Sequence, residues 1–178
     1  MKTAVVIVAA GSGSRAGIGT PKQYKKLGSK TVLALTIEAF AIIHKIEFIQ
    51  VVINESYTEK YDEVIRSLQV GSNTEKILTV CFGGPERCLS VKHGLEALER
   101  QKTKISHVLI HDAARPLVSS ELIASVLDEL PNSEAVLPVL PIVDTLWITD
   151  KNGLRPGPER DTILRAQTPQ GFNFQKIL

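Results

Sequence analysis

The feature that most constrains the fold is a buried strand that ends in a glycine-rich loop, within residues 4–24. Residues 4–10 (AVVIVAA) are a continuous apolar run, which is typical of a parallel strand buried on both faces. The loop that follows holds four glycines and two cations, Arg15 and Lys22. Glycine lets backbone N–H groups approach an anion closely, and a triphosphate requires positive charge beside it. The stretch therefore indicates an α/β fold with a triphosphate site after its first strand.

Strand-like and helix-like patterns alternate along the following chain. Apolar runs predict further strands at residues 48–53, 77–82, 107–110 and 135–140. Amphipathic stretches predict helices at residues 32–44, 59–68, 90–100 and 119–130. Such alternation is typical of a three-layer α/β sandwich with a mostly parallel central sheet, in which ligands bind at the carboxyl ends of the strands. The length of 178 residues fits a single domain.

The pattern changes after residue 140. Residues 141–168 contain two short β-like runs, 144–149 and 161–166, on either side of a turn-rich centre. They predict a β-arm that leaves the main sheet. Because an isolated hairpin is only marginally stable in water, the arm is expected to pack against a second copy of the chain in a homodimer. A hairpin folded back onto its own domain is the alternative.

Composition narrows the range of partners and locations. The net charge is +2 and no block of lysine or arginine stands out, so a nucleic-acid partner is not expected. The apolar runs are too short to span a bilayer, and the first strand lies where a signal peptide would lie, so no membrane association is expected. Cys81 and Cys88 have no histidine partners at metal-binding spacing. They are predicted to be reduced thiols of a cytoplasmic protein.

Two familiar glycine motifs fit the first loop poorly. Residues 11–16 (GSGSRA) match the G-x-G-x-x-G/A pattern of dinucleotide-binding folds, but Gly19 and Pro21 prolong irregular backbone where a helix should begin. That pattern also requires an acidic residue about 20 residues further on, and the candidate, Glu55, comes much later. The Walker A pattern fails because Lys22 follows a proline. An NAD(P)-binding oxidoreductase is therefore the weaker interpretation.

Four motifs taken together resemble a known family. They are AAGSGSRAG with PKQY in residues 9–24, GGPERCLSV at 83–91, HDAARP at 111–116 and RAQTPQGF at 165–172. In this order they are similar to the 2-C-methyl-D-erythritol 4-phosphate cytidylyltransferases of the non-mevalonate isoprenoid pathway. The resemblance implies a Rossmann-like nucleotidyltransferase fold of the GT-A type. It also implies attack of the acceptor phosphate on the α-phosphorus of CTP, with release of pyrophosphate.

The resemblance assigns the nucleotide to two loops. Arg15 and Lys22 would be catalytic, because nucleotidyl transfer needs positioning and charge neutralisation more than covalent help. The family usually has an acidic residue where this chain has Pro85, so that side-chain contact is not expected here. Arg87 is equally well explained as a charge on a helix surface. The implied nucleotide-binding residues are Ala9, Ala10, Gly11, Ser12, Gly13, Gly83, Gly84, Arg87 and Ser90.

The resemblance places the acceptor near the fourth strand. Asp112 would ligate Mg²⁺ or hold acceptor hydroxyls, since Mg²⁺ is usually bound by one or two carboxylates plus substrate phosphates. Arg115 would reach the acceptor, in its own subunit or across a subunit boundary. A structural Asp–Arg pair is the alternative. His111 is expected in the core or behind the site, and Thr168 would line the acceptor pocket.

The arm supplies the other implied acceptor residues. Asp144, Thr145 and the catalytic Arg160 would bind the acceptor phosphate, often in the neighbouring subunit's site, because the planar fork of arginine binds two phosphate oxygens at once. Arg160 is assigned by counting back from the motif at 168–170, and Arg155 is the fallback.

Several expectations concern the enzyme as a whole. Mg²⁺ or another divalent cation is expected with CTP. Family members continue with a segment that holds a further phosphate-binding lysine, so residues 1–178 are expected to be the first part of a longer chain, such as a fused cytidylyltransferase/cyclodiphosphate synthase. Ribitol-5-phosphate cytidylyltransferase is the alternative activity. A non-catalytic nucleotide-binding subunit is less favoured because it has less use for Arg15 and Lys22.

Overall fold

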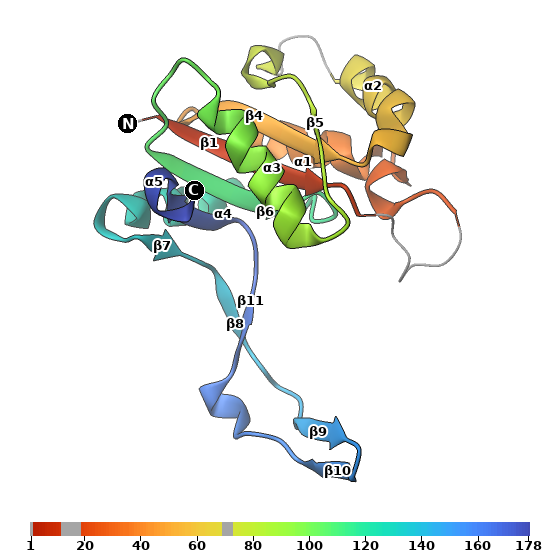
Figure 1. Ribbon diagram of the computed structural model, residues 1–178, viewed down its shortest axis with the longest axis vertical. Coiled ribbons are helices and arrows are strands. Elements are labelled where there is room, and N and C mark those ends of the chain that lie inside the picture. Colours follow the sequence, from red (N-terminus) through yellow and green to blue (C-terminus); the bar gives the residue numbers. More distant parts are fainter. Residues whose placement is uncertain (1, 12–18, 69–72) are drawn as a thin grey trace.

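The structure, a computed structural model, describes residues 2–11, 19–68 and 73–178. Within them a six-stranded sheet has the strand order β5-β4-β1-β6-β12-β7 (Figure 1). Strands β5, β4, β1 and β6 run parallel, whereas β12 is antiparallel to both β6 and β7. The predicted α/β fold with a mostly parallel sheet is therefore confirmed. The strands are β1 (Thr3–Ala9), β4 (Ile46–Ile53), β5 (Cys81–Phe82), β6 (His107–Asp112), β7 (Ala135–Val136) and β12 (Gln170–Asn173).

Helices cover both faces of this sheet and make three layers. Val5 and Ile7 of β1 lie in the core beneath α1, α2 and α4, while Ala4 and Val6 face α3 and α5. All four side chains are fully buried, which explains the continuous apolar run. The helices are α1 (Val32–Ala41), α2 (Thr58–Ser67), α3 (Arg87–Glu99), α4 (Ser120–Glu129) and α5 (Phe174–Ile177). Short 3-10 helices lie at Lys22–Tyr24, Glu55–Tyr57, Thr74–Lys76, Leu130–Asn132 and Arg160–Thr162, and a small hairpin pairs β2 (Lys26–Leu27) with β3 (Lys30–Thr31).

Two predicted strands differ from the observed ones. In the run 77–82, only Cys81–Phe82 joins the sheet, and Ile77 makes an isolated bridge to Ile49. The run 135–140 is divided at Leu137 and Pro138 into β7 and β8 (Val139–Pro141). Proline lacks the N–H that continues a ladder, so the chain leaves the sheet there and begins the arm.

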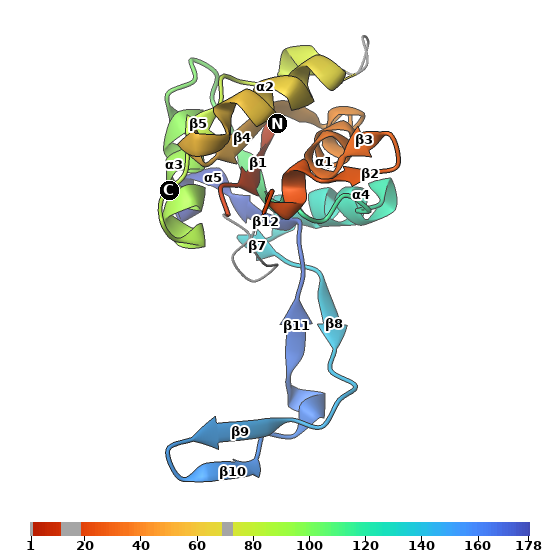
Figure 2. The ribbon, with the colours of Figure 1, turned by 90° about the vertical axis from the view of Figure 1, so that its right-hand side faces the viewer.

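The arm consists of two successive antiparallel ladders that project away from the sheet (Figure 2). The first pairs β8 with β11 (Leu164–Ala166), and the second pairs β9 (Trp147–Asp150) with β10 (Gly153–Pro156). The β-arm is therefore confirmed, and the alternative of a hairpin folded back onto the domain is wrong. Strand β10 lies in the stretch predicted to be a turn-rich centre, where no strand was expected. A tight turn joins β9 to β10. In this turn Gly153 has φ +108°, and the Asp150 carboxylate accepts a hydrogen bond from the Asn152 N–H at 2.8 Å.

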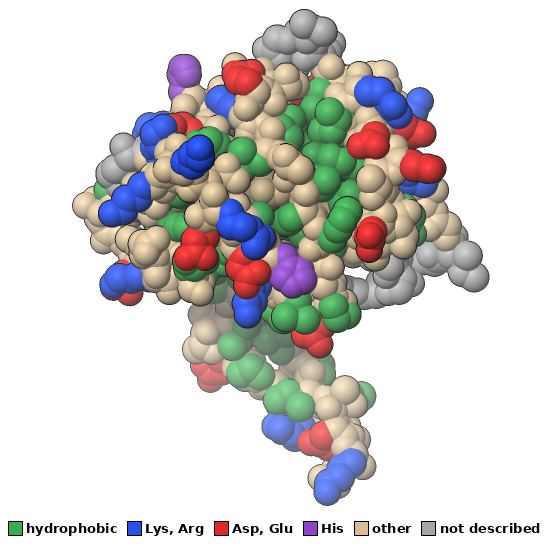
Figure 3. All heavy atoms as spheres, turned by 45° about the horizontal axis from the view of Figure 1, so that its top comes forward, with side chains coloured by type: hydrophobic (Ala, Val, Ile, Leu, Met, Phe, Trp, Pro, Cys, Tyr) green, Lys and Arg blue, Asp and Glu red, His purple; other side chains and the backbone are tan. Residues whose placement is uncertain are grey.

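Large apolar side chains of the arm are exposed, and many are visible along it in Figure 3. Their exposed fractions run from 43% at Val139 to 72% at Leu154. The others are Leu137, Leu140, Val143, Trp147 and Leu164. None of the helices in the described ranges is long and apolar enough to cross a membrane.

Candidate active site

The carboxyl end of β1 is joined to the helix that carries Lys22. The side chain of Gln23 is buried, and its Nε2 donates to the carbonyl oxygens of Ala9 at 2.7 Å and Gly11 at 2.9 Å. These two bonds hold the short helix of the exposed Lys22 at the carboxyl end of β1. Arg15, Ser12 and Gly13 lie outside the described residues. Gln23 lies within the PKQY motif, but no pattern in the sequence predicts these two bonds to distant carbonyl groups.

The loop after β5 lies directly against the end of β1. A Cβ on Gly83 would lie 2.4 Å from Cβ of Ala10 and 2.5 Å from Oγ of Ser90, so only glycine fits there. Ser90 is buried, and its Oγ accepts from Gly84 N–H at 3.2 Å and lies 3.1 Å from the Glu86 carbonyl oxygen. Its hydroxyl is thus bonded within the loop, where it fixes the backbone before α3. The two predicted nucleotide-binding loops are brought together, and their contacts with CTP stay a prediction.

A charged cluster follows at the end of β6. Asp112 Oδ1 lies 2.9 Å from Nη2 of Arg87, and Asp112 Oδ2 lies 3.2 Å from Nε of Arg115. Arg115 also donates through Nη1 to the Oε1 of Gln167. All three charged side chains are partly exposed. The cluster therefore joins a predicted nucleotide residue to two predicted acceptor residues, and it adds Gln167, to which the sequence assigned no role.

Behind this cluster lies a buried histidine. His111 is fully buried in β6, with its ring 4.7 Å from that of Phe40. Its Nδ1 lies 3.0 Å from Oγ1 of Thr168, and its Nε2 lies 3.1 Å from the carbonyl oxygen of Arg115. Burial lowers the pKa of His111 to about 4, so the ring is neutral at physiological pH. Thr168 is thereby held beside Asp112, whose backbone N–H faces Thr168 Oγ1 at 3.4 Å.

The arm residues form a separate group. Arg160 donates through Nη1 to the carbonyl oxygen of Val143 at 3.0 Å, which places it beside the exposed Asp144 and Thr145. The 3-10 helix that begins at Arg160 lies in the outer part of the arm, far from the sheet (Figure 2). Arg155, the fallback, pairs with Asp150 at 3.4 Å in the tip hairpin. Within one chain, the structure does not bring these residues to the cluster around Asp112.

The described residues offer Mg²⁺ few ligands. They contain no group of three or more His, Cys, Asp or Glu side chains that could hold a metal ion. Asp112 is the candidate ligand, and each of its oxygens contacts a guanidinium group. This donor set fits an ion that arrives with a triphosphate and takes one carboxylate from the protein, and it does not fit a dedicated metal cage.

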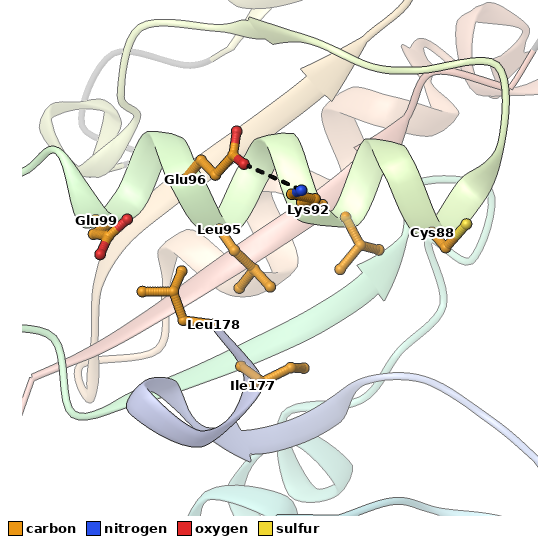
Figure 4. A pocket seen from close by; sticks show the side chains of 8 residues that line it. Cys88, Lys92, Leu95, Glu96, Glu99, Ile177 and Leu178 are labelled. Carbon is orange, nitrogen blue, oxygen red and sulfur yellow. Dashed lines mark ion pairs between the residues drawn. The ribbon is translucent and has the colours of Figure 1, made fainter.

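A hollow of about 350 Å³ lies elsewhere, between α3 and the C-terminal residues (Figure 4). Its walls are the aliphatic Leu95 and Ile177 with the Lys92–Glu96 ion pair at 3.8 Å. It contains none of the predicted site residues, so it is not where the nucleotide loops meet.

Comparison with known proteins decides the family. The family model for 2-C-methyl-D-erythritol 4-phosphate cytidylyltransferase (IspD) matches residues 3–178. The chain belongs to this family. It is 39% identical to the bifunctional enzyme IspD/IspF of Bradyrhizobium diazoefficiens, over 99% of this chain and 42% of that protein. It is 41% identical to the bifunctional enzyme of Ruegeria pomeroyi, over 100% of this chain and 44% of that protein. The chain thus spans less than half the length of these curated relatives.

Solved structures agree with this family. The 2-C-methyl-D-erythritol 4-phosphate cytidylyltransferase (IspD) of Francisella tularensis matches with a TM-score of 0.77 and 30% identity, over 99% of this IspD-family chain and 75% of that chain. The bifunctional IspDF of Campylobacter jejuni matches with a TM-score of 0.76 over 98% of this chain and 42% of that chain. At 23% identity the second match shows the fold alone.

Proposed function

We propose that this chain joins CTP and 2-C-methyl-D-erythritol 4-phosphate to give 4-diphosphocytidyl-2-C-methyl-D-erythritol and pyrophosphate. The observation that carries the proposal is the meeting of three segments at one edge of the sheet. They are residues 9–11 at the end of β1, tied to the helix of Lys22, the loop from Gly83 to Ser90, and the loop from Asp112 to Arg115. Membership of the cytidylyltransferase family supports the same reaction.

The reaction is an in-line displacement at the α-phosphorus. An oxygen of the acceptor phosphate forms the new P–O bond, the bond to the bridging oxygen of the β-phosphate breaks, and pyrophosphate leaves. Lys22 neutralises the charge that gathers on the phosphate oxygens, together with Arg15. Gln23 keeps Lys22 in place through its two bonds to the end of β1. Arg115 faces the acceptor from the loop after β6.

A divalent cation, Mg²⁺ in the first instance, enters with CTP in this proposal. When bound, it neutralises phosphate charge. Asp112, whose carboxylate now pairs with Arg87 and Arg115, would be the protein carboxylate that holds it. Turnover should therefore stop when the cation is removed by EDTA and return when Mg²⁺ is restored. Turnover that survives exhaustive chelation would remove the cation from the scheme.

A homodimer formed through the arm completes the site. The arm exposes large apolar side chains, and Arg160 with Asp144 and Thr145 lies far from the cluster of its own chain. An exposed apolar surface of this kind marks an interaction site. The arm of one subunit therefore brings Arg160 to the acceptor in its partner's site. A cytoplasmic location fits Cys81 and Cys88, which are both free thiols.

Pyrophosphate release is the direct test of the reaction. The assay crosses four nucleoside triphosphates with 2-C-methyl-D-erythritol 4-phosphate and ribitol 5-phosphate. We expect turnover with CTP and the methylerythritol phosphate. Turnover with ribitol 5-phosphate in its place would assign the alternative activity, and saturable NADH binding would favour the dinucleotide interpretation.

Mixed dimers test which subunit supplies Arg160. Lys22→Ala and Arg160→Ala are each expected to be inactive. If the arm acts across the dimer, a mixed dimer holds one site with Lys22 and Arg160 both intact. When equal amounts of the two variants re-associate at random, about half of the dimers are mixed, and each mixed dimer has one active site of its two. The mixture should then recover about a quarter of wild-type activity. No recovery, in a mixture shown to exchange subunits, would place Arg160 in the site of its own chain.

A further inference from the structure

We propose that His111 is a positioning residue of the acceptor pocket. Its Nδ1 accepts a hydrogen bond from the hydroxyl group of Thr168. Thr168 can then only accept a hydrogen bond from the substrate, so it faces a hydroxyl group of the polyol and not its phosphate. The inference deepens the proposed function and rests on it for the identity of the acceptor.

The hydrogen positions follow from the partners of the ring. Nε2 of His111 lies 3.1 Å from the carbonyl oxygen of Arg115, and a carbonyl oxygen can only accept. Nε2 therefore carries the ring hydrogen. Both ring nitrogens bond to neutral groups, and full burial favours the uncharged imidazole. Nδ1 is thus left with a lone pair, 3.0 Å from Oγ1 of Thr168.

This arrangement fixes the role of the Thr168 hydroxyl. Its single hydrogen points to Nδ1 of His111, and one of its lone pairs faces the backbone N–H of Asp112 at 3.4 Å. What remains is the other lone pair, which can accept a hydrogen bond but cannot donate one. A phosphate oxygen without a proton offers no hydrogen to it, whereas a polyol hydroxyl does. The phosphate is then left to guanidinium groups, among them Arg115.

The same ring joins the two segments that carry the acceptor residues. Through Nε2 it holds the backbone of Arg115, in the loop after β6, and through Nδ1 it holds Thr168, just before β12. The guanidinium of Arg115 crosses the same gap to Gln167. The two segments are thus bridged twice: by the His111 ring in the core and by the Arg115 guanidinium at the surface. Loss of His111 should therefore disturb the acceptor and leave the CTP loops in place.

Two matched pairs of variants separate these roles. Thr168→Val removes the hydroxyl at nearly constant shape, and Thr168→Ser keeps it. His111→Gln keeps a donor near the position of Nε2, and His111→Asn keeps an acceptor near that of Nδ1. We expect Thr168→Val and His111→Gln to raise KM for the polyol phosphate about 3- to 10-fold, the worth of one neutral hydrogen bond, with KM for CTP unchanged. Thr168→Ser should stay near wild type, and His111→Asn should change KM less than His111→Gln.

Substrate analogues and a control sharpen the test. Among acceptors that each lack one hydroxyl, wild type should discriminate against the one that normally contacts Thr168, and Thr168→Val and His111→Gln should lose that discrimination. His107, also buried in β6 and without a side-chain hydrogen bond among the described residues, gives the control His107→Asn, which should leave both KM values unchanged. Equal rises in KM for CTP and for the acceptor would overturn the proposal and indicate a purely structural histidine.

Nitrogen NMR of the full chain, labelled at histidine, tests the geometry without turnover. We expect His111 to be the Nε2–H tautomer at neutral pH, and the Nδ1–H tautomer would overturn the inference even in an active enzyme. If the expected tautomer is found but neither acceptor reacts, the proposed function fails instead. Calorimetric binding of the two polyol phosphates to the same variants then decides the role of Thr168.

Discussion

The α/β body and the arm are both built from β-strands, yet they bury very different amounts of side chain. In β1 of the body, Val5 and Ile7 are fully buried between two strands and a layer of helices. In the arm, Trp147 is 60% exposed and Leu154 is 72% exposed, although both lie in regular ladders. Hydrogen-bonded pairing alone therefore does not bury a strand. The body supplies its own covering layers, whereas these side chains of the arm stay exposed in the single chain.

The same contrast appears in the functional residues. In the body, the candidate residues are tied to one another, as Gln23 is to the end of β1 and His111 to Thr168. In the arm, Arg160 contacts only its own arm in the described contacts, through the Val143 carbonyl and Asp161. The body thus holds one preorganised group of candidate residues, and the arm holds a second group that would reach a site only in the proposed homodimer. Four measurements test this contrast.

Leucine truncation in the two regions should give the largest difference. Leu33→Ala opens a cavity under α1, where Leu33 is fully buried, and should lower the free energy of unfolding by about 3–5 kcal/mol. Leu154→Ala, the same substitution in the arm, should change it by less than about 0.5 kcal/mol. Urea unfolding measures both, at a concentration where sedimentation shows monomer. Similar losses at the two positions would mean that the arm packs on its own body.

Removal of the Lys22 charge should affect rate and not folding. Lys22 is exposed at the start of its 3-10 helix, so Lys22→Ala should keep the wild-type unfolding curve. The rate of pyrophosphate release should fall about 10²- to 10³-fold, as for the loss of one preorganised donor, with weaker changes in CTP binding. Lys25→Ala, at the exposed end of the same turn, is the control. An unchanged rate in Lys22→Ala would refute its assigned role.

Acid should destabilise the body through His111. Its pKa is about 4 in the folded chain and 6.5 when exposed, so between these values the unfolded chain binds a proton that the folded chain does not. The stabilisation is complete above pH 6.5 and is lost as the pH falls towards 4, by about 3 kcal/mol in total. Urea unfolding at several pH values should show this slope reduced in His111→Asn and intact in His44→Asn, where the histidine is exposed. An equal slope in both variants would assign the acid sensitivity to other groups.

A methyl group between the two nucleotide loops should have the smallest main effect of the four measurements. Gly83→Ala places a Cβ against Ala10 and Ser90 at 2.4 and 2.5 Å, so the loops must separate. We expect a loss of about 1–3 kcal/mol in unfolding free energy, as for other overpacked sites, together with weaker CTP binding. In Gly11→Ala the new Cβ has no atom of the described residues within 4 Å, and the substitution should leave stability almost unchanged. Equal stability of the two variants would show that the loops separate readily.

Much of the body could be predicted from the sequence because its signals are local. The apolar run of β1, the alternation of strands and helices, and the serine before α4 each reflect backbone geometry within a few residues, and Ser119 does cap that helix at 3.2 Å. The change of pattern after residue 140 likewise predicted the arm. Strand β10 was missed because it begins with Gly153 and ends with Pro156, which are turn-forming residues, and only its partner β9 defines it. Strand β12 pairs antiparallel with β6 and β7, and this direction depends on those two strands and not on the residues of β12.

The order of strands and loops could be predicted from the sequence alone, since hydrophobic period and glycine placement act over short distances. Two features appear only in the folded chain: the cluster of Arg87, Asp112, Arg115 and Gln167, and the hydrogen bond between His111 and Thr168, 57 positions further along. The physical reason is that a hydrogen bond between distant residues leaves no periodic trace in the chain. Its geometry is set by the packing of β6 against β12, which brings both segments to the same edge of the sheet.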